Sequence, residues 1–179
     1  DQAITRWNIR YSFYDKRIYV PIYDKGEMVQ YVARKSWNYP LDGAKRYIYI
    51  KGNPITKYLL GWGEAKNWDR LTLVENTFNA IWLRDLKVAT NFGSHLSKEQ
   101  ISKIVSSKAK SVALLWDEGA ATETEKAIKA LHREGIRAAY LDFPGQPDNY
   151  PIEVLEDMCN ITHQVALADK SKKVSWNKV

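Results

Sequence analysis

The stretch SVALLWDEGAATETEKAIKALHREG, residues 111–135, joins an apolar run to an acidic pair and then to a helical segment. The apolar run has the length and composition of a buried strand. Thr122 and Glu125 have the spacing of a capping box, and Gly135 has the position of a C-cap glycine. Asp117 lies between the predicted strand and the predicted helix. The stretch therefore predicts one strand–helix unit of an α/β fold, with an acid at the end of the strand.

The same alternation continues on both sides of this stretch. Helix starts are marked elsewhere too, because Ser97 and Gln100 also have capping-box spacing. Alternating strands and helices of this length predict a parallel sheet with right-handed crossovers, and ligands of such sheets bind beyond the carboxyl ends of the strands. The predicted strands are 71–75, 87–90, 111–116 and 138–143, and the predicted helices are 77–85, 97–107 and 122–134.

The first half of the chain has a different pattern. Runs 17–24 and 28–35 are rich in β-branched and aromatic residues and flank a glycine-bearing turn, so they predict a hairpin. Basic residues in this half alternate with Tyr and Trp, and the chain has a formal net charge of +6. This combination suits single-stranded nucleic acid. A solvated surface with its aromatics in the core is the alternative interpretation.

The composition excludes several classes of protein. A hydrophobic fraction of 45% and seven Trp describe a globular chain, and no apolar run approaches the ~20 residues of a membrane span. The first residues do not resemble a signal peptide, and the start at Asp1 rather than Met suggests an excised fragment. One Cys and three scattered His argue against disulfides and a structural zinc site, and suit a reducing cytoplasm. No P-loop signature is present.

Acidic residues follow three of the four predicted strands. Glu75 ends the first strand, Asp117 ends the third, and Asp142 and Asp148 lie at or beyond the fourth. Carboxylates that meet at one sheet edge repel each other unless a divalent cation neutralises them, and such oxygen ligands suit Mg²⁺ or Mn²⁺. A structural interpretation is also open, in which Glu75 caps the following helix and Asp117 is a loop acid.

Several of these segments resemble a known family. LTLVENTFNAIWL (71–83), VATNFGSHLSKEQISKI (88–104) and VALLWDEGAATETEKAIKALHREG (112–135) resemble the TOPRIM domain of bacterial and phage DNA primases. RIYVPIYDKGEMVQYVAR (17–34) and KRYIYIKGNPITKYLLGW (45–62) resemble the basic subdomain that precedes TOPRIM in these primases. The hairpin makes primase a more specific interpretation than the TOPRIM acids alone.

The resemblance covers roughly residues 5–155 and implies an organisation for the chain. It implies an α/β protein whose N-terminal subdomain is α+β. A small, basic, hairpin-containing subdomain at 1–69 precedes a TOPRIM-like four-stranded parallel sheet flanked by helices at 70–150. A C-terminal helix and tail occupy 151–179.

The resemblance also implies roles for individual residues. Glu75 matches the family's catalytic and metal-site Glu, and Asp117 matches the first Asp of its Asp–x–Asp motif, a catalytic metal ligand. Asp148 is what is left of a downstream acid pair, and Glu118 is a candidate substitute ligand. The expected metal ligands are thus Glu75, Asp117, Asp148 and Glu118, and the expected nucleic-acid- or nucleotide-binding residues are Arg34, Lys45, Arg46 and Lys57.

The sequence departs from the family pattern at three positions of the acidic site. Asn76 replaces a Gly, Asn79 replaces an Asp, and Gly119 stands where the second Asp of Asp–x–Asp is expected. An Asn can ligate a cation through its carbonyl but brings no charge. We therefore expect weaker metal binding than in a full acidic cluster.

The function implied by the resemblance is that of a DNA primase RNA-polymerase core. Such a core makes short RNA primers from NTPs on single-stranded DNA during replication, in a phage for example, with Mg²⁺ or Mn²⁺. The implied partners are the template, NTPs, and a replicative helicase or zinc-binding module on another chain segment, in the cytoplasm (the host's if the protein is viral). Two alternatives stay open. One is a catalytically weakened module that binds nucleic acid or a replication partner, and the other is a TOPRIM nuclease, which leaves the hairpin unexplained.

Overall fold

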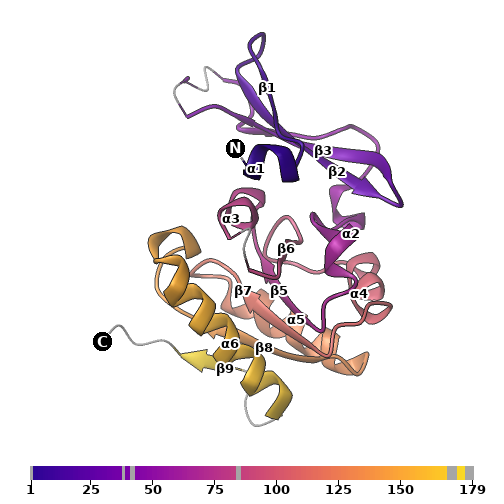
Figure 1. Cartoon of the computed structure of the whole chain (residues 1–179), viewed down its shortest axis with the longest axis vertical. Helices are drawn as coiled ribbons and strands as arrows, with labels where there is room; N and C mark the ends of the chain where they lie inside the picture. Colours follow the sequence, from indigo (N-terminus) through magenta and orange to yellow (C-terminus); the bar gives the residue numbers. More distant parts are fainter. Residues whose placement is uncertain (1, 38, 41–42, 84–85, 169–172, 176–179) are drawn as a thin grey trace.

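The computed structural model describes residues 2–37, 39–40, 43–83, 86–168 and 173–175. Within these residues the chain forms a four-stranded antiparallel sheet and a five-stranded parallel sheet. Figure 1 shows the antiparallel sheet at one end of the long axis and the parallel sheet at the other. The predicted α/β class, with an antiparallel N-terminal part, is confirmed.

The antiparallel sheet is built on the predicted hairpin. β2 (Arg17–Asp24) and β3 (Glu27–Lys35) pair along their length, and the turn between them uses Lys25 and Gly26, which both have positive φ. Two central residues with positive φ match the right-handed twist of the strands. The remaining elements of this part are α1 (Gln2–Arg6), β1 (Arg10–Ser12), which pairs with β2, and β4 (Tyr47–Ile48), which pairs with β3.

The parallel sheet contains the four predicted strands and one more. The extra strand, β9 (Lys173–Ser175), pairs with β8 at the sheet edge, in a segment that the sequence indicated only as tail. Its three residues are too few to show an alternating pattern. The strand order is β6-β5-β7-β8-β9, with β5 (Arg70–Val74), β6 (Val88–Thr90), β7 (Ser111–Leu115) and β8 (Arg137–Asp142).

Helices cover both faces of the parallel sheet, and their starts only partly follow the predictions. The Ser97–Gln100 capping box is confirmed at the start of α4. The predicted capping box at Thr122 and Glu125 is wrong, because α5 begins after Ala120 and Thr122 lies inside the helix. The helices are α2 (Trp62–Ala65), α3 (Thr77–Trp82), α4 (Lys98–Val105), α5 (Ala121–Arg133) and α6 (Ile152–Ala168), with 3₁₀ turns η1 (Ile55–Lys57) and η2 (Pro147–Asn149).

Glycine conformation explains the early start of α5. Gly119 has φ +94 and turns the chain so that it enters the helix two residues sooner than the hydroxyl pattern predicts. The Thr124 hydroxyl then donates to the carbonyl of Ala120. At the other end, Gly135 has φ +78 directly after the helix, as its C-cap position predicts.

The two sheets share a hydrophobic core. One cluster fills the space between the parallel sheet and helices α4 and α5, with Leu114 and Ile128 as members. A second cluster includes Ile22 and Val32 of the first sheet together with Val74 and Leu155 of the second part. The antiparallel sheet is therefore packed against the parallel part, and a cleft between them has walls from both.

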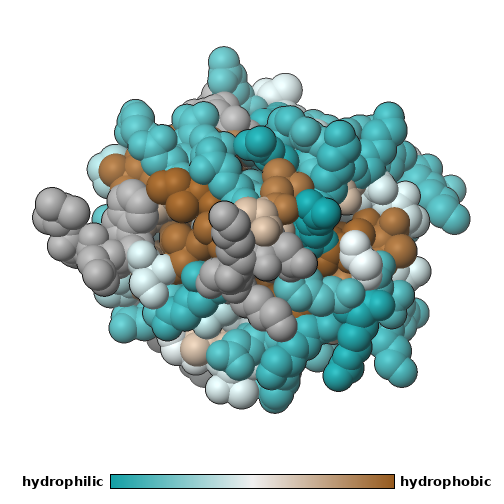
Figure 2. All heavy atoms as spheres, turned by 90° about the horizontal axis from the view of Figure 1, so that it is seen from below, coloured by the Kyte–Doolittle hydropathy of each residue, from teal (hydrophilic) through white to brown (hydrophobic). Residues whose placement is uncertain are grey.

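The surface away from the first sheet is predominantly hydrophilic. Figure 2 shows this side, seen from below Figure 1, with small hydrophobic areas among hydrophilic side chains. Among the described helices, none is both long enough and apolar enough to span a bilayer.

Candidate active site

Three of the predicted acids lie together at the carboxyl edge of the parallel sheet. Glu75 follows β5, Asp117 follows β7 by way of Trp116, and Asp148 lies in η2, beyond the end of β8. All three line one cleft of about 580 Å³. The parallel topology brings these residues together although 73 positions separate the first from the last (148 − 75).

The acids of this cleft affect one another's ionisation. Partial burial, followed by the negative charges of Glu75 and Asp148, raises the pKa of Asp117 to about 6. The carboxylates therefore repel each other at neutral pH in the absence of a cation. A bound divalent cation would relieve this repulsion.

The two asparagines that stand where the resemblance predicts a Gly and an Asp have distinct roles. The Asn76 Oδ1 accepts a 2.9 Å hydrogen bond from the backbone N–H of Asn79 and caps α3. The interpretation of Glu75 as the helix cap is therefore wrong, and its carboxylate is free of that task. Asn79 is buried, and its Nδ2 donates a long, 3.5 Å hydrogen bond to Oδ1 of Asp117. Asn79 thus supplies a donor where an Asp would supply further negative charge.

Backbone contacts hold the loop after β6 against the acids. The Gly93 N–H donates to the carbonyl of Glu75 at 2.7 Å, and the preceding Phe92 has φ +64. A non-glycine residue in this region is strained and needs support from its surroundings. Buried Asn91 gives that support, because its Oδ1 accepts from Trp116 Nε1 at 3.1 Å and its Nδ2 donates to the carbonyls of Gly93 and His95.

Basic and aromatic residues of the first sheet form the opposite wall of the cleft. The Arg34 guanidinium lies 3.7 Å from the ring centroid of Trp37, 5.0 Å from that of Phe78 and 5.8 Å from that of Tyr47. Its Nε is buried and has no hydrogen-bond partner among the described residues. Burial lowers the pKa of Arg34, and Arg46 lies on the same wall.

The remaining predicted site residues lie elsewhere. The Oε2 of Glu118 accepts from the N–H of Gly145 at 2.9 Å, in a separate hollow on the other side of Asp117. Asp142, the other acid beyond β8, forms a 2.6 Å ion pair with Lys173. Lys45 and Lys57 are not among the described residues that line the cleft. The structure thus brings together Glu75, Asp117, Asp148, Arg34 and Arg46.

Some residues of the cleft were not singled out from the sequence. Trp37, Tyr47 and Phe78 surround Arg34, and Tyr49 and Gln146 complete the wall. The alternation of basic and aromatic residues in the first half was a general signal for three of them. Phe78 lies outside that alternating pattern, because it belongs to α3 in the second half of the chain.

The donors of the cleft fit a magnesium or manganese ion that is completed by substrate. Within the described residues, no three or more His, Cys, Asp and Glu side chains lie so that they could hold a metal ion by themselves. Mg²⁺ needs no such cage, since it commonly binds one or two carboxylates together with waters and substrate phosphates. The partial burial of Asp117 beside the negative charges of Glu75 and Asp148, which raises its pKa, is what favours a cation here.

The arrangement of the two sheets and the cleft defines a class of fold, that of the primase RNA-polymerase domain. The structure resembles the zinc-binding and RNA-polymerase domains of the Aquifex aeolicus primase, with a TM-score of 0.71, 23% identity, and coverage of 82% of this chain and 40% of that one. It also resembles the primase fragment of the bacteriophage T7 primase-helicase (TM-score 0.62, 14% identity, 87% and 69% covered). The RNA-polymerase domain of Mycobacterium tuberculosis primase DnaG matches with a TM-score of 0.63 at 11% identity, over 87% of this chain and 59% of that chain.

These structural neighbours confirm the predicted primase-like fold. At identities of 11–23% the likeness establishes the fold alone. The chain spans 40% of the Aquifex aeolicus structure that it matches. No protein-family model and no curated protein sequence matches the chain significantly.

Proposed function

We propose that this chain is the RNA-polymerase core of a DNA primase, which joins NTPs into short RNA primers on single-stranded DNA during replication. The observation that supports this function is the cleft itself. Glu75, Asp117 and Asp148 line one side and Arg34 and Arg46 the other, in a fold shared with primase domains. A polymerase of this kind needs negative ligands for a cation and positive groups for phosphates on facing walls.

In the proposed reaction, the arginines bind the phosphates of the NTP or the template backbone. The 3′-hydroxyl oxygen of the primer attacks the α-phosphorus, a new P–O bond forms, and the bond to the pyrophosphate leaving group breaks. In this proposal Glu75 would accept the proton of the hydroxyl. Asp117 and Asp148 would hold Mg²⁺ or Mn²⁺ with Glu75, and the ion supplies charge neutralisation of the triphosphate.

The partners proposed for this chain follow from the same chemistry. They are single-stranded DNA and NTPs, with a helicase or a zinc-binding module on another chain segment. The basic subdomain at 1–69, the TOPRIM-like domain at 70–150 and the C-terminal segment at 151–179 are the proposed organisation. Figure 1 is compatible with it, although β9 of the last segment joins the sheet of the second.

Primer synthesis on single-stranded DNA tests the proposal directly. Wild-type chain, with a zinc-binding module supplied, is incubated with NTPs and Mg²⁺ or Mn²⁺. We expect synthesis that falls by at least about 100-fold in Glu75→Gln and Asp117→Asn, since each removes a charged group from the reacting centre. Lys129→Ala, in α5 and outside the residues that line the cleft, is the control and is expected to keep its activity. Substantial synthesis by both cleft variants would contradict the assignment.

A second candidate function is a binding module with a weakened metal site. Asn79 and Gly119, in place of two acids, are the specific observation that favours it. This candidate predicts no primer synthesis with either metal, together with single-stranded DNA binding that weakens steeply with salt. Nicking of duplex DNA without NTPs would instead indicate a nuclease.

A further inference from the structure

A group of exposed aromatic side chains lies at one end of the antiparallel sheet. Phe13 is 79% exposed and Tyr14 is 98% exposed, and both lie in the turn that joins β1 to β2. Tyr11 and Tyr39 beside them are also exposed. Together with Lys16 these residues are called the aromatic tip. Large exposed aromatics that gather in one place mark interaction sites, whereas scattered single ones do not.

Contacts within the aromatic tip hold its side chains in a defined arrangement. The rings of Tyr11 and Phe13 meet edge to face, with centroids 4.9 Å apart. The Nζ of Lys16 lies 6.0 Å from the ring centroid of Phe13 and 5.4 Å from that of Tyr39. Backbone contacts tie this turn to the end of β3, because the Ser36 N–H donates to the carbonyl of Lys16 at 2.9 Å.

The charge of the aromatic tip favours a polyanion. Asp15 is the acid of this turn, and its carboxylate accepts a 2.7 Å hydrogen bond from the Tyr19 hydroxyl and lies 3.7 Å from Nε of Arg17. Its Oδ2 is therefore engaged inside the sheet, and its Oδ1 is buried. Lys16 and Lys35 provide positive charge at the same end, and the Nζ of Lys35 donates to the carbonyl of Asp15.

A backbone contact relates the aromatic tip to the cleft. Trp37 lines the cleft beside Arg34, and the N–H of Tyr39 donates to the carbonyl of Ser36, the residue before Trp37, at 3.2 Å. Lys16 lies near the rings of both Tyr39 and Phe13, so a strand that leaves the cleft past Trp37 and Tyr39 would find a positive charge and a second ring beyond them. Positive charge beside successive aromatic faces is the arrangement that binds single strands by base stacking.

We propose that the aromatic tip is a second binding site for single-stranded nucleic acid, which stacks the bases of the template that lie beyond the cleft. This inference rests on the proposed function and deepens it, since it assigns a place to template outside the reacting centre. The occupant is single-stranded DNA rather than a protein partner, because the exposed rings are accompanied by lysines and the acid of the turn is already engaged.

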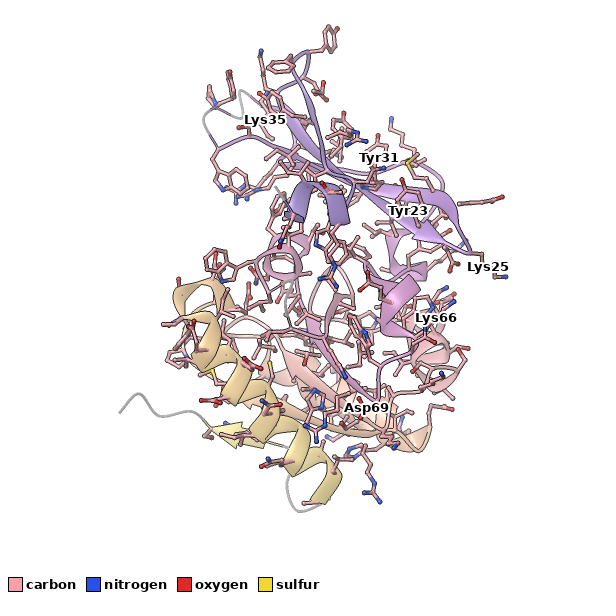
Figure 3. The ribbon with its side chains drawn as sticks, in the orientation of Figure 1. Tyr23, Lys25, Tyr31, Lys35, Lys66 and Asp69 are labelled. Carbon is pink, nitrogen blue, oxygen red and sulfur yellow. The ribbon has the colours of Figure 1, made fainter. Side chains whose placement is uncertain are left out.

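Binding of fluorescent oligothymidylates of two lengths tests the proposal. The long one spans cleft and tip, and the short one fills the cleft alone. The test variants are Phe13→Ala/Tyr14→Ala and Lys16→Asn. The controls lie at the other end of the same sheet, where Figure 3 labels Lys25 opposite to Lys35. One control is Met28→Ala, which removes an exposed apolar side chain. The other is Lys25→Asn, because Lys25 has a backbone φ of +52, close to the +56 of Lys16.

We expect the aromatic double variant to bind the long oligothymidylate roughly 5- to 100-fold more weakly, the loss that stacking of one or two bases supports. Lys16→Asn should weaken it by a smaller factor and lower the salt dependence. The short oligothymidylate and both controls should show less than a twofold change. Binding of an oligouridylate of the same length as the long oligothymidylate shows whether the tip prefers RNA or DNA.

Equal binding of the long oligothymidylate by wild type and both test variants would overturn the proposal. A second result would also overturn it. If the test variants bind DNA as wild type does but no longer associate with a helicase or zinc-binding module, the tip is a protein-docking surface. Failure of the proposed function is distinguishable from these results. In that case wild type makes no primers, yet the tip variants still lose affinity for the long single strand.

Discussion

Asn79 decides how much negative charge the cleft carries. Its amide donates to Asp117 from a buried position, where the resemblance to primases predicts an acid. We expect Asn79→Asp to destabilise the metal-free chain by about 1–3 kcal/mol, because it replaces a donor by a buried charge beside two others. The same variant should bind Mn²⁺ severalfold more tightly, since ligand charge governs affinity.

Thermal unfolding in EDTA and calorimetric titration with Mn²⁺ measure these two effects for Asn79→Asp. Asn79→Ser is the matched control, because it removes the amide without adding charge. It should lose some stability and gain no affinity. Tighter metal binding by both variants would show that the charge at this position is not the cause.

Asp117 gives the metal-free chain a pH dependence of known sign. Its folded pKa, about 6, lies above the ordinary value of 3.8, so its contribution to stability is fully present below pH 3.8 and is lost as the pH rises through 6. We therefore expect Asp117→Asn to be more stable than wild type at pH 8 in EDTA, and the difference to vanish near pH 4. Thermal melts over this range measure it, and a less stable variant at pH 8 would contradict the pKa shift.

Gly119 shows why the second acid of the motif cannot simply be restored. A Cβ at this position meets no atom within 4 Å, but φ is +94, where L residues are strained. Gly119 also lines the hollow of Glu118 rather than the cleft. We expect Gly119→Asp to cost about 1–2 kcal/mol in urea unfolding without improving Mn²⁺ binding. Gly119→Asn, which tolerates this backbone better, should cost less, and a gain in affinity for Gly119→Asp would contradict the placement.

At the residue scale, the acids of the site were predictable and their surroundings were not. Glu75, Asp117 and Asp148 could be found because each follows a strand of one parallel sheet, whose carboxyl ends share an edge. Glu118 could not be excluded from sequence, because its partner, the Gly145 N–H, lies 27 positions away. Such a contact depends on how two loops meet and leaves no local pattern.

Among the elements, α6 is joined to the sheet by a buried histidine. The Nδ1 of His163 lies 2.9 Å from the Ser111 hydroxyl of β7, and its Nε2 lies 3.2 Å from the Thr72 hydroxyl of β5. Burial, with a smaller effect of Arg70, lowers the pKa of His163 from 6.5 to about 4. This packing therefore needs the neutral ring.

The neutral state of His163 gives a second pH effect. The unfolded chain takes up the proton first, so stability is intact above pH 6.5 and falls as the pH drops through this range toward 4. The loss is on the order of 3 kcal/mol. His163→Gln should be less stable at pH 7 yet lose less stability between pH 6.5 and 4.5. Urea unfolding at both pH values measures this, and an unchanged pH slope would contradict it.

The longer elements were predictable and the shorter ones were not. β2, β3, β7, α4 and α5 have enough residues for a period or a turn signal to show. β9 has three residues and exists because β8 offers it an open edge. The start of α5 was misplaced because the backbone conformation of Gly119 prevailed over the hydroxyl at Thr122. Tertiary context decides such features.

At the scale of the whole molecule, the cleft exists only because two sheets are held together. The cation–π contacts of Arg34 join its two walls, since Trp37 belongs to the first part and Phe78 to α3. Far from the cleft, Lys103 of α4 bonds both carboxylate oxygens of Asp24, at the end of β2, at 3.1 and 3.0 Å. Ordering of the two parts by such contacts is what would bring phosphate-binding and metal-binding groups to one substrate.

The contribution of the Asp24–Lys103 ion pair to the free energy of unfolding can be measured directly. The side chains of this pair are 22% and 23% exposed. Asp69, just before β5, and Lys87, just before β6, form a 3.3 Å ion pair whose side chains are 54% and 57% exposed. A double-mutant cycle with Asp24→Asn and Lys103→Met should give a coupling of about 1 kcal/mol, reduced in 1 M salt. The same cycle at Asp69 and Lys87 should give less than about 0.5 kcal/mol, because water screens that pair more. If the Asp24–Lys103 and Asp69–Lys87 pairs give equal coupling free energies, the Asp24–Lys103 pair adds no more than an exposed pair does. The shared hydrophobic core, and not this ion pair, would then hold the sheets together.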